Sequence, residues 1–194
     1  MHDALINYIN SYATTKLTDS EKDRIGHAFL PKRFRKKQYF LQEGEVRKYA
    51  AFIVKGAMRQ YSIDDKGTEH IVHLAIENWW AVDRESFVML TPSQYNIDTW
   101  EDTETLLVTR ADILNLQSQI PSLSQMSKNL DDRHSIATQR RLNASISLTA
   151  EERYNDFAKI YPELLQRFPQ HIIASYLGIT KETLSRVRRH TAKK

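Results

Sequence analysis

The stretch QHIIASYLGITKETLSRVRR, residues 170–189, has the spacing of two short helices joined by a tight turn. Ala174 is small where a second helix would cross the first, and Gly178 follows four residues later, where the turn favours a positive φ and therefore a residue without Cβ. Thr180 is placed to cap the second helix through its hydroxyl. Five apolar residues would form the core between the helices: Ile173, Leu177, Ile179, Leu184 and Val187. The sequence therefore predicts a helix-turn-helix.

The second predicted helix keeps polar and cationic side chains for its outer face. We expect four of them to face base edges in a DNA major groove, namely Lys181, Glu182, Ser185 and Arg186. In that role Arg186 would contact guanine O6 and N7, and Glu182 would accept from a cytosine amine. Five further residues are expected at phosphates: Thr180, Arg188, Arg189, Lys193 and Lys194. The alternative is an ordinary helical hairpin with a solvated basic face.

Charge is divided unevenly along the chain. The net charge of the 194 residues is +4, but residues 138–194 hold 11 Lys or Arg against 5 Asp or Glu, while residues 1–137 hold 17 against 19. Segregation of this kind indicates that the C-terminal part meets a polyanion, although a basic tail can also be merely solvated.

The composition excludes several classes of protein. The chain has no cysteine, which rules out disulfides, thiolate metal sites and cysteine nucleophiles. It contains no apolar run long enough to span a membrane and no secretory leader, so we expect a cytoplasmic protein without a membrane partner.

The middle of the sequence reads as a series of β-hairpins. Residues 49–76, YAAFIVKGAMRQYSIDDKGTEHIVHLAI, alternate short β-branched and aromatic runs with glycine-containing turns. Residues 32–110 hold seven or eight such strands, and two short helices precede them, the second opened by a capping box of Thr18 and Glu21. The predicted fold class is α+β, with an N-terminal β-roll of jelly-roll type and flanking helices.

A long helix is predicted after Pro121. Six apolar positions step along it by three, four or seven residues, which is typical of a dimerisation seam: Leu123, Met126, Leu130, Ala137, Ala144 and Leu148. The alternative is a helix that lies across its own β-domain. Thr149 and Glu152 form another capping box, and the segment before the helix-turn-helix contains no strand pair. The expected divisions are a β-roll domain at 1–120, a dimerisation helix at 121–148 and a wholly helical DNA-binding domain at 149–194.

This order of parts resembles the Crp/Fnr family of bacterial transcription regulators. Two segments carry the resemblance, GITKETLSRVRR at 178–189 and EGEVRKYAAFIVKGAMRQYSIDDKGTEHIVHLA at 43–75. The resemblance implies base-reading roles for Lys181, Glu182 and Arg186, a homodimer formed through the long helix, a palindromic site on double-stranded DNA, and contact with RNA polymerase.

The sequence departs from the family at the effector site. Cyclic-AMP-binding members hold the ribose and phosphate with a glycine-glutamate turn and an arginine, whereas this chain has Val82-Asp83 and Tyr95-Asn96 there. A buried cyclic phosphate needs a paired cation, and Arg84 is flanked by Asp83 and Glu85, which we expect to neutralise it. We therefore expect no cyclic AMP and no cofactor, while an unidentified effector stays open.

Aromatic side chains gather around this stretch. We expect an effector pocket formed by Trp79, Trp80, Asp83, Arg84, Tyr95 and Trp100. The alternative is that the aromatic residues simply fill a small core.

The rival function is a small-molecule-binding β-roll protein without DNA binding, either a cupin-like enzyme or a sensor. A cupin metal needs converging histidines, and the odd spacing of His70 and His73 places them on opposite faces of a strand. No nucleotide-binding or hydrolase motif occurs. We therefore predict neither a catalytic residue nor a metal site.

Overall fold

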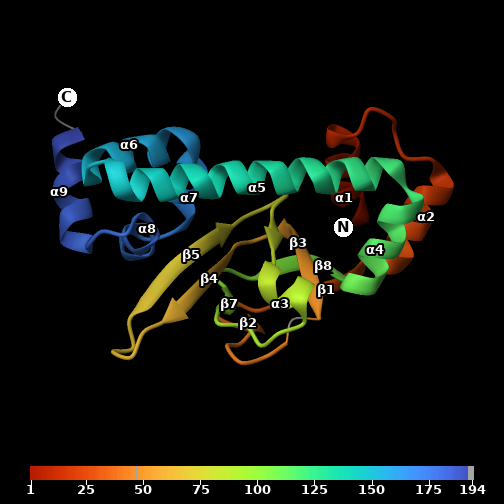
Figure 1. Cartoon of the computed structure of the whole chain (residues 1–194), viewed down its shortest axis with the longest axis horizontal. Helices are drawn as coiled ribbons and strands as arrows, with labels where there is room; N and C mark the ends of the chain where they lie inside the picture. Colours follow the sequence, from red (N-terminus) through yellow and green to blue (C-terminus); the bar gives the residue numbers. More distant parts are fainter. Residues whose placement is uncertain (47, 192–194) are drawn as a thin grey trace.

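The computed structural model describes residues 1–46 and 48–191. It has the predicted α+β architecture (Figure 1). A β-roll lies below a long helix, α5 (Pro121–Ser147), which runs along the molecule; the N-terminal helices lie at one end of it and the C-terminal helices at the other (Figure 1). Among the described residues, no helix combines the length and the apolar content needed to cross a membrane.

The roll consists of two antiparallel four-stranded sheets. The first sheet contains, in spatial order, β1 (Leu30–Phe34), β8 (Thr103–Thr109), β3 (Tyr49–Lys55) and β6 (Trp80–Ala81). The second contains β2 (Tyr39–Leu41), β7 (Asn96–Thr99), β4 (Met58–Ile63) and β5 (Glu69–Ala75). The predicted hairpin turn joins β4 to β5, with Gly67 at φ +78. The strands β1 and β5 therefore lie at sheet edges.

Eight shorter helices surround the roll in the described chain. They are α1 (His2–Tyr12), α2 (Asp19–Ala28), α3 (Arg84–Met89), α4 (Arg110–Gln119), α6 (Ala150–Ile160), α7 (Pro162–Arg167), α8 (Gln170–Leu177) and α9 (Lys181–Thr191). Both predicted capping boxes, at Thr18 and at Thr149, are present. The sequence did not predict α3 and α4, each of which begins at a side-chain cap rather than at a periodic apolar pattern.

Three apolar cores hold these elements together. One lies between α1, α2 and the sheet containing β3, and includes Leu5, Ile9 and Phe52. A second fills the inside of the roll. The third joins the outer face of β4 and β5 to α6, α7, α8 and α9, because Tyr61 and Ile71 belong to the same cluster as the buried residues of these helices. The C-terminal helices are thus packed directly on the roll.

Candidate nucleic-acid interface

The turn between α8 and α9 has the backbone that the sequence predicts. Gly178 adopts φ +66, and the next amide, that of Ile179, donates to the carbonyl of Ala174 at 3.0 Å. A Cβ at this position would meet nothing within 4 Å, so the conformation and not the space requires glycine.

The small core of the helix-turn-helix is closed. Ala174 and Leu184 are 2% and 1% exposed, and Ile173 and Val187 are also buried. The side chains of Tyr154 and Phe157 on α6 belong to the same cluster and cover it from the other side. The predicted packing positions are confirmed.

Thr180 caps α9. Its hydroxyl oxygen accepts from the backbone amide of Thr183 at 3.2 Å, as predicted. This hydrogen bond fixes the first turn of α9.

The outer face of α9 is solvated. Lys181, Glu182, Arg186, Arg188 and Arg189 are exposed. Within the described chain, none of their cations lies within 4 Å of a carboxylate oxygen. The cationic side chains of this face are therefore available to an anion. Their assignment to bases or phosphates stays a prediction.

Three of the residues predicted to contact DNA stand apart from that exposed set. Ser185 is half-buried, which shortens its reach. Lys193 and Lys194 lie outside the described residues.

Ser175 attaches α8 to the edge of the roll. Its hydroxyl donates to the carbonyl of Glu69 and accepts from the amide of Ile71, both at 2.9 Å. Because β5 is an edge strand, these backbone groups have no neighbouring strand on that side. Sequence reasoning missed this contact, since a serine in a helix carries no signal of a distant partner.

Arg141 joins three elements. Its guanidinium donates to the carbonyls of Ile71 and Val72 on β5 and to that of Tyr176 on α8, and it lies 4.1 Å from the centre of the Tyr176 ring. In the structure it connects the long helix to both the roll and the helix-turn-helix.

Arg167 on α7 forms ion pairs with two carboxylates of the roll. It donates to Glu101 at 2.8 and 2.6 Å and to Glu77 at 2.9 and 3.2 Å. Burial raises the pKa of the Glu77 carboxyl, but hydrogen bonds from Arg167 and from the amide of Gly56 outweigh it and bring this pKa below its ordinary value. The carboxylate therefore stays charged and paired.

The structure does not bring the six residues of the predicted effector pocket together around one space. Trp79 contacts Tyr161, and Trp100 contacts Phe168, so both face the C-terminal helices. Trp80 instead packs beside Phe52 in the core that the N-terminal helices cover. The sequence could not separate these positions because aromatic residues signal burial without saying on which side of a sheet.

The remaining three predicted pocket residues are also dispersed. Asp83 is 4% exposed and caps α3 by accepting from the amide of Glu85. Arg84 pairs with Asp131 on α5 at 2.5 Å, not with Asp83 or Glu85 as expected. Tyr95 lies in the segment after α3, where its carbonyl accepts from Ser93.

The inside of the roll is nearly filled. The space between Met58, His73, Ala81 and Ile97 has a water-accessible volume of about 0 Å³, whereas ligand pockets commonly measure roughly 300–1,000 Å³.

The histidine pair of β5 is divided between two environments. His70 contacts Asp64 at 2.9 Å, while the His73 ring lies 6.4 Å from that of His134 on α5. Burial, with further contributions from His134 and Arg141, lowers the pKa of His73 to about 4. In the described part of the chain, no three His, Asp or Glu side chains are grouped as metal ligands.

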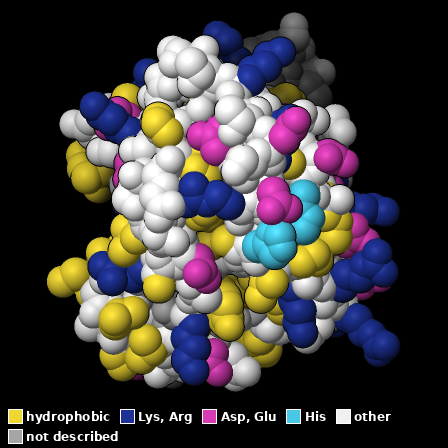
Figure 2. All heavy atoms as spheres, turned by 90° about the vertical axis from the view of Figure 1, so that its right-hand side faces the viewer, with side chains coloured by type: hydrophobic (Ala, Val, Ile, Leu, Met, Phe, Trp, Pro, Cys, Tyr) yellow, Lys and Arg dark blue, Asp and Glu magenta, His cyan; other side chains and the backbone are white. Residues whose placement is uncertain are grey.

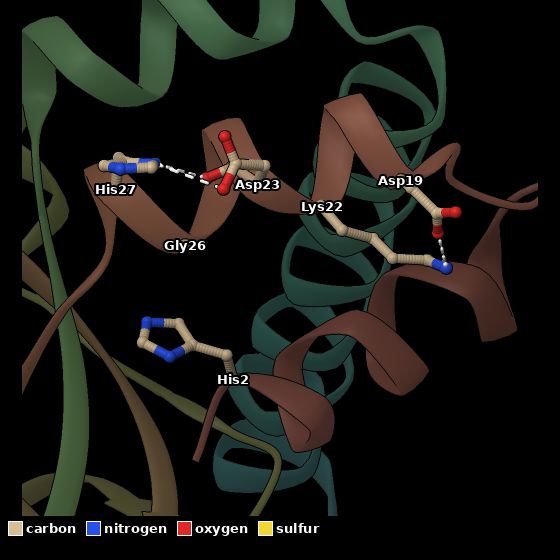
Figure 3. Close-up of a pocket in the computed structure, with 6 residues that line it drawn as sticks. All are labelled: His2, Asp19, Lys22, Asp23, Gly26 and His27. Carbon is tan, nitrogen blue, oxygen red and sulfur yellow. Dashed lines mark hydrogen bonds and ion pairs between the residues drawn. The ribbon is translucent and has the colours of Figure 1, made fainter.

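A shallow hollow lies at the other end of the molecule, between α1 and α2 (Figure 3). His27 there contacts Asp23 and Lys22 contacts Asp19, so its charged groups are paired locally. Figure 2 shows this end face, on which basic and acidic side chains are intermixed. It lacks the excess of cations of the outer face of α9, where four exposed Lys or Arg accompany the single carboxylate of Glu182.

The seam predicted along α5 needs correction. Leu123 and Met126 are 0% and 1% exposed and lie in the chain's own core with α1, and Leu130 packs against the same core. Ala137 is exposed, while Ala144 and Leu148 are half-buried. The first half of the seam, Leu123 to Leu130, packs in the chain's own core, which the sequence could not foresee because the same periodicity fits intrachain and interchain packing.

A different stripe of α5 faces outward. Every residue from 131 to 143 is exposed. Ile136, Leu142 and Ile146 are 50%, 61% and 78% exposed. Leu142 and Ile146, four residues apart, share one face of the helix, and Ile136 lies about 120° around the axis from Leu142. This outward stripe, not the buried seam, is free to meet another molecule.

Comparison with known proteins places the fold. Residues 31–119 match the family model of the cyclic nucleotide-binding domain. A search of curated proteins found no match.

Solved structures match most of the chain. FixK2 from Bradyrhizobium japonicum has 19% identity and a TM-score of 0.69, covering 85% of each chain. The Thermus thermophilus Catabolite Activator Protein has 22% identity and a TM-score of 0.56, covering 91% of this chain and 84% of that one. A protein from Eubacterium rectale, described as a transcriptional regulator of the crp/fnr family, has 14% identity and a TM-score of 0.65, covering 90% and 83%.

Proposed function

We propose that this chain, which carries a cyclic nucleotide-binding domain and has the fold of the Crp/Fnr regulators, is a sequence-specific DNA-binding transcriptional regulator. The observation that carries the proposal is the unpaired cationic face of α9 on a closed helix-turn-helix core. Lys181, Glu182 and Arg186 read bases, with Ser185 at the edge of that set. Arg188 and Arg189 bind phosphates.

The protein acts as a homodimer on a palindromic site. The outward stripe of α5 supports this assembly, because Ile136, Leu142 and Ile146 expose apolar surface that a twofold copy of the same helix would cover. A twofold dimer presents its two recognition helices to successive major grooves, with half-sites about 34 Å apart. Contact with RNA polymerase in the cytoplasm belongs to the same proposal and rests on the family resemblance.

Cyclic AMP is not the effector. Three observations support this: the space between Met58, His73, Ala81 and Ile97 inside the roll has no room for a water molecule, the buried Asp83 side chain caps α3, and Arg84 is paired with Asp131. A cyclic phosphate would meet an anion and no free cation there. Isothermal titration calorimetry is expected to show no cyclic AMP binding, and micromolar affinity would overturn this part of the proposal.

The direct test selects DNA with the purified protein. Genomic fragments are incubated with it, and bound fragments are sequenced, with and without an extract of cell metabolites. The expected result is a set of fragments that share a palindrome, bound by a particle that sediments as a dimer. Fragments that share no motif, or a protein that stays monomeric on DNA, would contradict the proposal.

A further inference from the structure

A cluster of titratable and cationic side chains lies where β5 meets α5 (Figure 1). The ring of His73 on β5 is half-buried, and its centre lies 6.4 Å from that of the His134 ring on α5 and 6.2 Å from that of the Trp79 ring. Among the described residues, no carboxylate oxygen lies within 4 Å of a ring nitrogen of either histidine. A proton added to His73 would therefore find no anion beside it.

The charged groups on α5 oppose protonation of His73. Burial is the main reason that the pKa of His73 lies at about 4, and the charges of His134 and Arg141 lower it further. The carboxylate of Asp131, three residues before His134, is already paired with Arg84 on α3. A protonated His73 therefore gains repulsion from α5 and no ion pair.

The other elements around His73 leave that charge uncompensated too. On β4, Arg59 lines the same space as His73, and two carboxylates already bind its guanidinium, those of Glu69 and Asp98. The C-terminal helices present phenol groups at this junction, those of Tyr161 and Tyr176. The contact between β5 and α5 is therefore built for a neutral His73.

The second half of α5 is held on the roll by few contacts. Every residue from 131 to 143 is exposed. Arg141 supplies three hydrogen bonds there, to the carbonyls of Ile71 and Val72 on β5 and to that of Tyr176 on α8. Because Val72 directly precedes His73 and Tyr176 belongs to the helix-turn-helix, a displacement of α5 at His73 would also remove this anchor of α8.

We propose that acidification releases α5 and α8 from β5 through protonation of His73, and that DNA binding weakens as a result. This inference rests on the proposed function. The docked state is the structure described above. In the released state the contacts that hold α8, and with it α9, on the roll are lost. The competing explanation is that His73 only fills space, in which case an amide side chain of similar size would serve equally well.

Proton linkage gives the direction of the effect. His73 binds a proton with a pKa of about 4 in the docked state and with the ordinary value of 6.5 in the released state. Docking is therefore fully favoured above about pH 6.5 and weakens as the pH falls toward about 4. Between about pH 7.5 and about pH 5.5, the ratio of released to docked protein should rise about tenfold.

Hydrogen exchange at the Ile71 amide measures the release. This amide donates to the hydroxyl of Ser175 on α8 at 2.9 Å, so it becomes open to solvent when α8 leaves the strand. NMR gives its exchange rate at several pH values, and division by the intrinsic rate gives the opening ratio. The test variant is His73→Gln. The matched control is His70→Gln, which replaces a histidine of the same strand that contacts Asp64.

Wild type and the His70→Gln control are expected to show an opening ratio about tenfold larger at pH 5.5 than at pH 7.5. His73→Gln should remove most of this change. Fluorescence anisotropy with the selected palindrome should show that wild type loses at least about twofold and up to about tenfold more affinity than His73→Gln over the same pH range. Equal melting temperatures of the three proteins at pH 7.5 establish that each is folded.

Three results would overturn the inference while the proposed function stands: an opening ratio of wild type that does not change with pH, a His73→Gln variant that follows wild type, or equal losses of DNA affinity in the two proteins. If His73→Gln does not fold, an NMR titration of the His73 ring in wild type decides, since a midpoint near 6.5 overturns the inference and one near 4 supports it. The proposed function itself fails if wild type binds no duplex at pH 7.5 and low salt.

Discussion

Two groups of arginines in this molecule have opposite surroundings. Arg141 and Arg167 lie where the roll meets the C-terminal helices. Arg141 donates to backbone carbonyls, and Arg167 pairs with carboxylates. Arg186, Arg188 and Arg189 on α9 are exposed and unpaired with carboxylates in the described chain. Arginine side chains therefore occur in two settings: the first group holds the helix-turn-helix on the roll, and the second group faces solvent.

The difference teaches how α9 is positioned. Because α8 is hydrogen-bonded to the edge of β5 and Arg167 joins α7 to two carboxylates of the roll, intrachain contacts hold the C-terminal helices, α9 among them, on the roll. An effector that moved α9 relative to the roll would have to break these contacts. Each group of arginines can be replaced separately, so the effect on stability can be distinguished from the effect on DNA binding.

The largest effect is expected from Arg186→Ala. Loss of one bidentate base contact is worth about 1–3 kcal/mol per half-site, so a dimer would lose roughly 2–6 kcal/mol on its palindrome. The melting temperature should stay unchanged because the side chain has no intrachain ion pair in the described residues. Anisotropy with the palindrome and with base-substituted duplexes measures the loss. A variant that weakened all duplexes equally would contradict the base-reading role.

The next largest effect is the pH dependence of the free energy of unfolding that His73 causes. Its folded pKa is about 4, below the unfolded value near 6.5. The unfolded chain therefore binds a proton first, and the free energy of unfolding falls as the pH drops from about 6.5 to about 4, by on the order of 2–3 kcal/mol. Below that window this contribution no longer changes.

Urea unfolding at several pH values between 4 and 7 measures this loss. His73→Gln removes the titrating group and should flatten the dependence relative to wild type. The nearby His134 also titrates, and its pKa is lowered chiefly by burial, so the difference between the two proteins isolates His73. An unchanged pH dependence in the variant would show that His73 is protonated normally in the folded protein.

Arg167→Ala tests the junction itself. It leaves Glu77 and Glu101 without their shared partner, and the free energy of unfolding should fall by about 2 kcal/mol, less than for a fully buried pair because all three side chains are about one-third exposed. Arg167→Lys should recover part of the loss. A variant as stable as wild type would mean that apolar packing alone holds the helices on the roll.

Thr149→Ala gives the smallest effect. It removes the cap of α6, whose hydroxyl accepts from the amide of Glu152 at 3.3 Å, and should cost about 1 kcal/mol of stability. Thr149→Ser, which keeps the hydroxyl, is the matched control. Equal thermal stability of the alanine and serine variants would rule out a contribution of the cap.

The helix-turn-helix could be predicted from the sequence because its determinants are local. Ala174, Gly178 and Thr180 lie within seven residues, and each is fixed by backbone geometry. Both capping boxes were predictable for the same reason. The β-roll could be predicted because alternating apolar and polar residues in short runs indicate half-buried strands.

Non-local features could not be predicted. The periodicity of α5 identified an apolar seam but could not say whether a second copy or the chain's own core covers Leu123 and Met126. Likewise, the aromatic residues around α3 pack on different sides of the sheets, which only the topology decides. The docking of Arg141 on β5 joins residues about seventy positions apart and leaves no pattern in either segment.

The salt dependence of DNA binding tests the central claim, that paired arginines position α9 and unpaired ones bind DNA. Anisotropy of wild type with its palindrome should give a log–log slope of about −3.6 or steeper from Arg188 and Arg189 in two protomers, and Arg188→Gln/Arg189→Gln should remove about that much of it. A slope near zero in the wild type, or one that this double variant leaves unchanged, would contradict the account.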